Sequence, residues 1–185
     1  MSDTYDQDRK EAADWAREML ASDALILDTE TSGLDDTAEI VQIAIIDMHG
    51  NTLLDALIKP VNGIPRSASR IHGITDETVA EAPSFADVWP SICDVIRDKT
   101  VIIYNADYDT RLLAQSARAH GITLLRVDYV TYKCAMLPYS AWVGSWNDYH
   151  GNYRWQRLPA GDHSALGDCL ATLNVLQKMA AQEPA

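Results

Sequence analysis

Four acidic residues and one histidine have the types and the spacing that metal-assisted hydrolysis requires. They are Asp28 and Glu30 in ILDTETSGL, Asp109 in NADYDTRLL, and His163 and Asp168 in HSALGD. Asp28 and Glu30 are two residues apart on a predicted strand, so both side chains lie on one face. Converging carboxylates repel one another unless a cation or a proton lies between them. An oxygen-rich site with a histidine suits hard divalent metals and the activation of water.

Length and composition predict a single domain, 1–185, in a water-soluble protein. The chain has 185 residues, of which 47% are hydrophobic, enough for one substantial core. Apolar runs all fall short of the roughly 20 residues that span a bilayer, and the polar start MSDTYDQDRKEAADW is not a secretory signal. We therefore expect no membrane association. Cys93, Cys134 and Cys169 form no CxxC pair, which favours reduced thiols, a cytoplasmic location and no cysteine-bound zinc.

The net charge of −12 disfavours a protein that lies along duplex nucleic acid by charge neutralisation. It does not exclude a nuclease, because bound divalent ions would reverse the local field where a phosphate has to sit. The charge therefore favours an enzyme that grips a short strand end and depends strongly on its metal.

The hydrophobic pattern predicts an α/β fold, with a central mixed five-stranded sheet whose first three strands are antiparallel and with helices on both faces. We expect strands at 24–31, in two runs of 39–60 joined at His49–Asn51, at 100–105 and at 124–130 (LLRVDYV), and a loop at Pro60–Arg70. Helices are expected at 1–22, at Ser84–Arg97 with Ser84 as N-cap, at Asp107–His120 closed by Gly121, and at Ala165–Ala180.

The segment 138–160 is rich in large aromatic residues and is an insertion or flap. Tyr139, Trp142, Trp146 and Tyr149 recur at spacings of three and four, which predicts a helical stripe. One interpretation is that this stripe packs on the core. The other is a base-stacking or partner-binding flap beside the active site, and an aromatic stripe alone does not separate the two.

The order and neighbours of the acidic residues and the histidine resemble the DEDDh family of 3′–5′ exonucleases, which have a ribonuclease-H-like fold. DTETSGL resembles the first motif of that family, Asn105-Ala106-Asp107-Tyr108-Asp109 the second, and His163 with Asp168 the third, His-x4-Asp. IHGIT and Pro83-Ser84-Phe85 are similar to the family between the first two motifs. The resemblance covers about Leu25 to Met179 and implies that the chain is a phosphodiester hydrolase. The proofreading subunits of bacterial polymerases belong to the same family.

The resemblance also implies roles for individual residues. Asp28, Glu30, Asp109 and Asp168 would bind two divalent ions, Mg²⁺ or Mn²⁺, with Asp28 bridging them, in two-metal hydrolysis. His163 would be the general base, a task that the ordinary pKa of histidine fits. Substrate contacts are expected from Thr31, Leu34, His72 and Asn105. Arg154 and Arg157 flank Trp155 just before the His163 loop, where incoming phosphates could pass.

Two details of the motifs can be argued from helix geometry. Five residues along a helix turn through about 500°, so His163 and Asp168 cannot both face one site from one regular helix. We expect His163 on the loop before the last helix and Asp168 in its first turns. Asp107 competes with Asp109 as the ligand of the second motif, because both lie in the first turn of one helix; its alternative role is to stabilise the helix N-terminus.

The sequence also departs from the family. Only a few residues separate RWQRL from His163, so the helix that usually precedes the third motif is missing or is replaced by the aromatic segment. The chain stops at QEPA, which favours a stand-alone enzyme over a polymerase subunit. We expect a 3′–5′ exonuclease that releases 5′-mononucleotides from single-stranded or frayed DNA ends. The alternatives are the same chemistry on RNA or short oligoribonucleotides, and an inactive domain that binds nucleic acid or protein.

Overall fold

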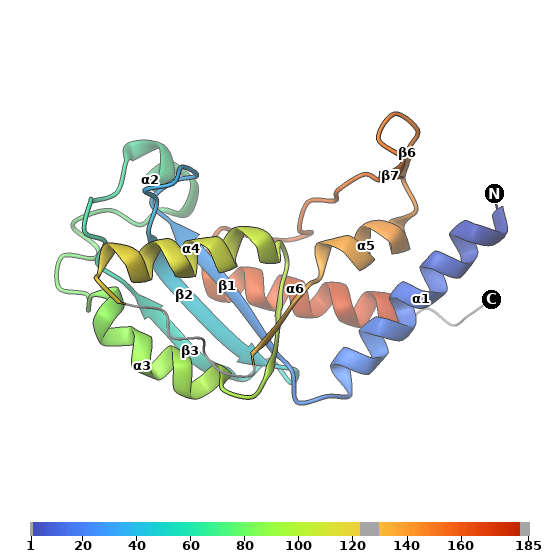
Figure 1. Cartoon of the computed structure of the whole chain (residues 1–185), viewed down its shortest axis with the longest axis horizontal. Coiled ribbons are helices and arrows are strands. Elements are labelled where there is room, and N and C mark those ends of the chain that lie inside the picture. Colours follow the sequence, from blue (N-terminus) through green and yellow to red (C-terminus); the bar gives the residue numbers. More distant parts are fainter. Residues whose placement is uncertain (1, 123–129, 182–185) are drawn as a thin grey trace.

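A computed structural model describes residues 2–122 and 130–181. Helices and strands alternate after an antiparallel start (Figure 1). Their bounds are α1 (Ser2–Leu20), β1 (Leu25–Thr31), β2 (Ile40–Asp47), β3 (Thr52–Leu57), α2 (Arg66–His72), α3 (Phe85–Ile96), β4 (Thr100–Ile103), α4 (Ala106–Ala119), β5 (Thr131–Cys134), α5 (Met136–Val143), β6 (Trp146–Asn147), β7 (Asn152–Tyr153) and α6 (Ala165–Ala180).

Five of the strands form one mixed sheet in the order β3-β2-β1-β4-β5. β1 pairs with β2, and β2 with β3, in antiparallel fashion, whereas β1–β4 and β4–β5 are parallel. The predicted five-stranded sheet with three antiparallel strands at its start is confirmed. Because β1 is central and parallel to β4, the carboxyl ends of these two strands meet at the same edge of the sheet.

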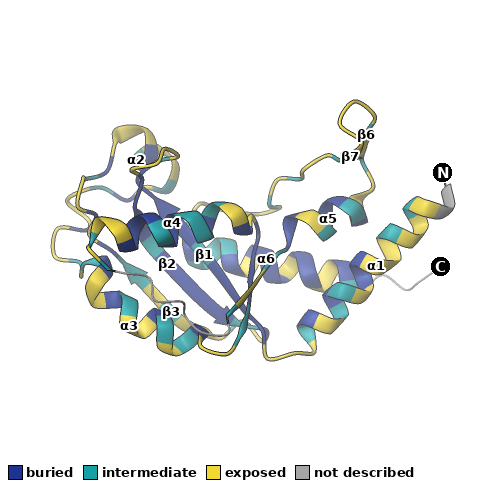
Figure 2. Cartoon of the chain, viewed as in Figure 1, coloured by how far each residue is buried: buried dark blue, intermediate teal, exposed yellow. Residues whose placement is uncertain are grey.

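Helices cover both faces of the sheet, and the buried strands lie between them (Figure 2). Successive side chains of β1 point to opposite faces of the sheet, so each one packs against the helices on its own face. Ile26 belongs to the apolar cluster formed with α1, α5 and α6, whereas Leu25 and Leu27 belong to the cluster formed with α3 and α4. Asp28 and Glu30 are two and four residues after Ile26 on the same strand, so their side chains point to the same face as Ile26, the one covered by α6.

Local signals for turns and caps are confirmed. Gly50, with φ of 83°, completes the tight turn between β2 and β3. The Ser84 side chain accepts a hydrogen bond from the backbone N–H of Asp87, and the Asp87 carboxylate accepts one in return from Ser84 N–H, which makes a capping box. Gly121, with φ of 66°, follows α4, and the next residue, Ile122, donates its N–H to the carbonyl of Ala117 at 2.8 Å.

Two predicted boundaries were wrong or fall elsewhere. The expected loop Pro60–Arg70 contains the start of α2 at Arg66, because Pro65 precedes the helix and Gly73, in the left-handed region, closes it. The expected strand 124–130 lies almost wholly outside the described residues. The last strand of the sheet is β5, which begins at Thr131 and pairs with β4.

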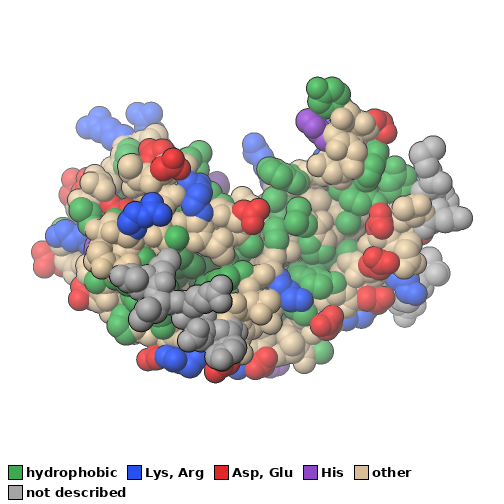
Figure 3. Space-filling model, viewed as in Figure 1, with side chains coloured by type: hydrophobic (Ala, Val, Ile, Leu, Met, Phe, Trp, Pro, Cys, Tyr) green, Lys and Arg blue, Asp and Glu red, His purple; other side chains and the backbone are tan. Residues whose placement is uncertain are grey.

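The predicted long aromatic helix was also wrong. α5 ends at Val143, because Gly144 takes a left-handed conformation (φ 78°) and its N–H caps the Ser140 carbonyl. Tyr139 and Trp142 are buried on α5, as the core-packing interpretation predicted, but the chain then forms the β6–β7 hairpin. The surface view shows this hairpin projecting beside a notch, with hydrophobic side chains gathered around it (Figure 3). None of the helices within the described ranges is long and apolar enough to cross a membrane.

Candidate active site

The first two carboxylates lie where β1 leaves the sheet. Asp28 pairs across the ladder with Ala44 of β2 and Glu30 with Gln42, and the register shifts between Glu30 and Thr31. Such a bulge bends the strand and redirects the side chains next to it. The Asp28 side chain is half-buried and Glu30 is only 9% exposed. Both carboxylates are therefore held at the edge of the sheet by the most central strand.

Asp109 reaches the same place from the first turn of α4. Its side chain is 5% exposed, and its Oδ1 accepts a hydrogen bond of 2.7 Å from the Thr29 hydroxyl of β1. Asp107, two residues earlier, is exposed to solvent. Of the two competing residues of the second motif, Asp109 is thus the one that faces the other carboxylates, and the role of each in catalysis stays a prediction.

The third motif is divided between a loop and a helix, in agreement with the geometric argument. His163 lies in the loop before α6 with φ of 61°, a left-handed conformation that a non-glycine residue adopts only where its surroundings hold it. The Ser164 side chain caps α6 by accepting the N–H of Gly167. Asp168, in the first turn of α6, accepts the N–H of Asp162 at 2.9 Å, and this bond ties the carboxylate to the loop.

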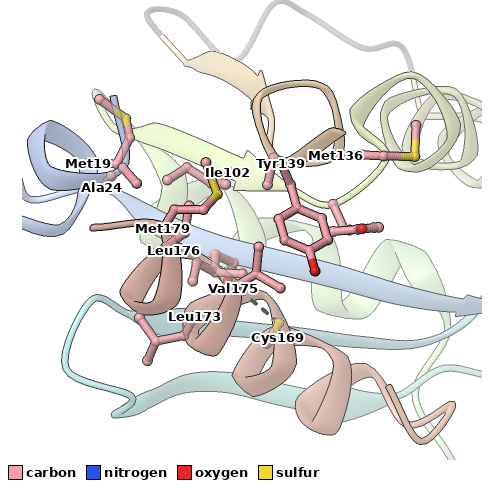
Figure 4. Packing of buried hydrophobic residues seen from close by; sticks show 14 of the residues in the cluster. Met19, Ala24, Ile102, Met136, Tyr139, Cys169, Leu173, Val175, Leu176 and Met179 are labelled. Atoms are coloured by element: carbon pink, nitrogen blue, oxygen red, sulfur yellow. Dashed lines mark hydrogen bonds between the residues drawn. The ribbon is translucent and has the colours of Figure 1, made fainter. Parts of the chain in front are cut away.

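The core fixes the position of α6 behind Asp168. Figure 4 shows Cys169, Leu173 and Leu176 among the apolar side chains where α6 packs on the sheet. The Cys169 thiol lies 3.5 Å from the carbonyl oxygen of Ala44, and Cys169 is fully buried. Because Asp168 precedes this anchored residue, its carboxylate is held over the end of β1.

The five predicted side chains converge on one pocket. Potential ligand atoms of Glu30, His163 and Asp168 all lie within 4.8 Å of one another. A cavity of about 220 Å³ at this point is lined by Asp28, Thr29, Glu30, Tyr104, Asn105, Tyr108, Asp109, Leu158, His163 and Asp168. Residues from β1, α4, the loop before α6 and α6 itself therefore form a single site.

The carboxylates of this pocket hold their protons more tightly than ordinary carboxylates do. Burial raises the pKa of Asp28 well above its usual range, and the neighbouring charges of Asp109 and Asp168 add to the effect. Burial, followed by the charges of Asp168 and Asp109, raises the pKa of Glu30 to about 7. Burial likewise raises the pKa of Asp109 to about 7, although the hydrogen bond from Thr29 opposes it.

Asp168 titrates in a more balanced environment. Burial raises the pKa of its carboxyl group, whereas the backbone N–H groups of Asp162 and His163 and the His163 ring oppose that rise. Carboxylates that are held close together repel one another when ionised, which raises their pKa values, and a bound cation relieves this repulsion. Carboxylate oxygens with one imidazole are also a donor set that Mg²⁺ or Mn²⁺ accepts. The residues present thus fit divalent ions.

Of the residues expected to contact substrate, Thr31 and His72 are engaged within the protein. The Thr31 and Tyr108 hydroxyls lie 2.7 Å apart, and both lie within 2.9 Å of the Gly33 carbonyl oxygen. His72 accepts the N–H of Ile74 at Nδ1, so its Nε2 carries the proton and donates to the Thr31 carbonyl at 3.2 Å. Burial, and secondarily the charge of His163, lowers the pKa of His72, where the Thr31 carbonyl opposes the shift.

Four other expected contacts have free side chains. Leu34 is 79% exposed just beyond β1. Asn105 precedes α4 without making a side-chain cap and lines the pocket. Arg154 and Arg157 are exposed, and their guanidinium groups make no hydrogen bond or ion pair within residues 2–122 and 130–181. Arg154 lines a second groove at the hairpin rather than the catalytic pocket. The substrate roles of all six stay predictions.

Four pocket residues were missed in the sequence: Thr29, Tyr104, Tyr108 and Leu158. Thr29 lies between the two acidic residues of the first motif, so that motif contained its signal. Tyr108 is the aromatic position of the second motif, so the motif itself contained the signal. Tyr104 ends the apolar run of β4, and its hydroxyl donates to the Gln156 carbonyl at 3.0 Å. Leu158 comes from the segment before the third motif and lines the pocket only through the folding of that segment. No local pattern distinguishes Leu158.

Residues 25–176 match the family described as exonuclease, of the RNase T type. The chain belongs to this exonuclease family, a class of nucleases, as the DEDD-type motifs predicted. The protein of Escherichia phage 186 described as uncharacterised exonuclease CP81 is 37% identical over an alignment of 179 residues, which covers 89% of this chain and 92% of that protein.

Solved structures support the same fold. Exonuclease X in complex with 5′-overhanging duplex DNA has a TM-score of 0.57 and 26% identity, over 86% of this chain and 94% of that one. The complex of Escherichia coli exonuclease I with single-stranded DNA has a TM-score of 0.63 and 16% identity, over 83% of this chain and 39% of that one. The expected ribonuclease-H-like fold is confirmed. The chain spans 43% of the DNA polymerase III epsilon subunit of Buchnera aphidicola, with which it is 32% identical.

Proposed function

We propose that this protein is a metal-dependent 3′–5′ exonuclease that removes 5′-mononucleotides from single-stranded or frayed DNA ends. The observation that carries the proposal is the convergence of Glu30, His163 and Asp168 within 4.8 Å, in a pocket that Asp28 and Asp109 also line. A pocket of about 220 Å³ suits the terminal nucleotide of a strand rather than the side of a duplex.

The residues divide into those that hold metal and those that move a proton. Asp28, Glu30, Asp109 and Asp168 would hold two divalent ions, Mg²⁺ or Mn²⁺. When bound, these ions supply Lewis-acid activation and compensate the charge that develops at phosphorus. The carboxylates make the pocket competent for this by staying close together in a partly desolvated site, as the raised pKa values of Glu30 and Asp109 indicate.

His163 is the proposed general base. One of its ring nitrogens accepts a proton from the attacking water as the oxygen bonds to phosphorus and the bond from phosphorus to the 3′ oxygen of the upstream nucleotide breaks. The products are a 5′-mononucleotide and a strand shortened by one residue with a new 3′ hydroxyl. The conformation of His163 at φ 61° aims its side chain toward Glu30 and Asp168.

Residues in the pocket and next to it are proposed to position the strand end. The amide of Asn105, which bonds to none of the described residues, is available to a phosphate or sugar oxygen, and the Tyr108 ring forms a wall. Leu34, exposed beyond β1, is placed to contact the terminal base pair of a frayed end. The His72 ring donates a hydrogen bond to the Thr31 carbonyl, and this bond supports the adjoining edge of the pocket. The relatives that were solved with single-stranded or overhanging DNA favour DNA as substrate.

The test uses strands of matched sequence in DNA and RNA, labelled at the 5′ end, with Mg²⁺, with Mn²⁺ and with a chelator. We expect stepwise shortening from the 3′ end, release of 5′-mononucleotides, and no hydrolysis in the chelator. Closed circular single strands should survive because they offer no end. Cutting of circles, or activity without metal, would overturn the proposal, and a higher kcat/KM on RNA would transfer it to the RNA alternative.

A further inference from the structure

The β6–β7 hairpin has an anchored side and an exposed side. On the anchored side the Trp146 and Tyr153 rings meet edge to face at 5.1 Å, and Tyr5 of α1 packs on both at 6.0 and 6.1 Å. The Tyr153 hydroxyl also donates to Asp8 of α1 at 2.6 Å. These contacts fix the hairpin to α1, so the side chains on its outer side are held in one orientation.

The exposed side carries large aromatic rings that the fold does not use. Tyr149 is 89% exposed and Trp155 is 71% exposed, and the His150 ring lies 4.8 Å from the Tyr149 ring, edge to face. A groove of about 590 Å³ is lined by Asn147, His150, Asn152, Tyr153, Arg154 and Trp155. Trp155 borders it directly, and Tyr149 adjoins it through the ring of His150. Exposed rings of this size at a groove mark a binding surface more often than chance exposure does.

The charge at this groove favours an anionic ligand. Several basic residues elsewhere are neutralised by carboxylates, among them Arg97 by Asp94 and Lys99 by Asp23. Arg154 has no such partner in the part of the chain that the structure describes, although the net charge of the protein is −12. An unpaired guanidinium beside flat aromatic rings suits a strand with phosphates along one side and bases along the other.

The segment that follows β7 lines the groove with one residue and the catalytic pocket with another. Trp155 lines the groove, Leu158 lines the pocket, and Tyr104 of the pocket holds the Gln156 carbonyl between them at 3.0 Å. Three residues span at most about 11 Å. Because one nucleotide of a stacked strand rises about 3.4 Å, a strand leaving the pocket reaches Trp155 roughly three nucleotides upstream of the scissile phosphate.

We propose that the outer side of the hairpin, with Tyr149, Arg154 and Trp155, is a stacking platform for the bases of the single strand upstream of the cleaved nucleotide. The proposal rests on the proposed nuclease function, and it adds a substrate-length requirement. Strands too short to reach the platform are held by the catalytic pocket alone. Longer strands gain the stacking energy of one or more bases and are the preferred substrates.

The first experiment compares kcat/KM for a strand of about twelve nucleotides with kcat/KM for a dinucleotide, in the wild type and in Tyr149→Ala, Trp155→Ala and the double variant. Loss of one base–ring stack should lower the ratio of the two values at least about fivefold per ring, the low end of what such stacking contributes. A general loss of folded protein affects both substrates equally and cancels in the ratio. Tyr132→Ala, an exposed aromatic residue on the edge strand β5, is the matched control and should keep the wild-type ratio.

A second measurement is independent of catalysis. The same variants are placed in a chain that carries Asp28→Asn, and binding of the fluorescently labelled longer strand is followed by anisotropy. We expect weaker binding by at least about fivefold for each ring removed. The strand should also quench the tryptophan fluorescence, and Trp155→Ala should remove that quenching although it keeps the other four tryptophans. Wild-type ratios and affinities in the double variant would overturn the platform and leave these rings to a protein partner. Absence of hydrolysis by the wild type with intact, ring-dependent binding would instead overturn the proposed function and keep the platform.

Discussion

Thr29 and Asp109 are joined by a buried hydrogen bond of 2.7 Å between the Thr29 hydroxyl and Oδ1 of the carboxylate, although 80 residues separate them in the chain. The bond connects β1, which carries Asp28 and Glu30, to the first turn of α4. It also lowers the pKa of Asp109 against the effect of burial, which raises it. One hydroxyl thus both positions a proposed metal ligand and keeps it closer to its charged form.

Replacing Thr29 with valine should therefore weaken metal binding. Thr29→Val keeps the shape of the side chain but removes the donor, so the pKa of Asp109 should rise further and the carboxylate should be less charged at neutral pH. We expect the Mg²⁺ concentration for half-maximal activity to rise about tenfold or more, the usual cost of losing a group that supports a metal ligand. Thr29→Ser retains the hydroxyl and is the control. An unchanged Mg²⁺ requirement in Thr29→Val would show that the bond is only structural.

The second prediction separates the two aspartates of the NADYD motif. Asp109→Asn should lose at least about a hundredfold in kcat/KM, because losing a group that only supports a metal ligand already costs up to about that much. Asp107→Asn makes the same change of charge two residues away at an exposed position and should keep most of the activity. Steady-state kinetics on one DNA strand decides the matter, and the reverse order of the two variants would show that the second motif was aligned in the wrong register.

The third prediction concerns the stability of the metal-free protein. The pKa of Glu30 rises from 4.5 to about 7 and that of Asp109 from 3.8 to about 7. In this window the folded protein keeps protons that the unfolded chain has released, so stability is fully present below the unfolded pKa values and is lost as the pH rises through about 7. In a chelator we expect a higher Tm at about pH 5.5 than at about pH 8, and saturating Mg²⁺ should reduce the difference.

The controls for this pH effect use the same two aspartates. Asp109→Asn removes one of the titrating groups and one of the charges that raises the pKa of Glu30, so its Tm should depend less on pH. Asp107→Asn lowers the net negative charge by the same amount at the surface and should follow the wild type. If both variants flatten the profile equally, the general charge of the protein causes the effect and the pocket does not.

Much of this fold was predictable because local and global signals agree. The capping box of Ser84 and Asp87, and Gly121 after α4, are local patterns that the tertiary structure leaves in place. The five candidate site residues could be found because the motifs specify types and order. Once the third motif required His163 and Asp168 to face one site, helix geometry placed His163 in a loop and Asp168 in a helix.

The remainder depended on contacts that no local pattern contains. The aromatic repeat from Tyr139 to Tyr149 has helical spacing, and this spacing outweighed the local stop signal of Gly144 in the prediction. The hairpin that follows depends on the packing of Trp146 and Tyr153 on α1, which no local pattern contains. Leu158 enters the pocket only because Tyr104 fixes the neighbouring Gln156. In each case a contact between residues far apart in the sequence determines the local structure, and a short stretch of sequence does not contain that contact.

The last prediction concerns Gly167, which lies between His163 and Asp168 and is required by a close approach. A Cβ atom at this position would clash with Oδ1 of Asp162. That oxygen accepts hydrogen bonds from the backbone N–H of Ser164 at 3.0 Å and from its hydroxyl at 2.8 Å. The loop that carries His163 is therefore held by an exposed aspartate, whose carboxylate can move away from Gly167 only by releasing Ser164.

Gly167→Ala should push Asp162 away and free His163 from its left-handed conformation. We expect kcat to fall about tenfold, a part of the roughly 10²–10⁴-fold that general acid–base catalysis contributes. The Tm should change little, because alanine favours the helix while the loop bonds are lost. Asn174→Ala, an exposed change on the same helix, is the control. Asp162→Ala alone should reproduce the loss, and the double variant should be no worse than either single one, since both act by releasing the same loop. Additive losses in the double variant would mean that Gly167 is needed for another reason.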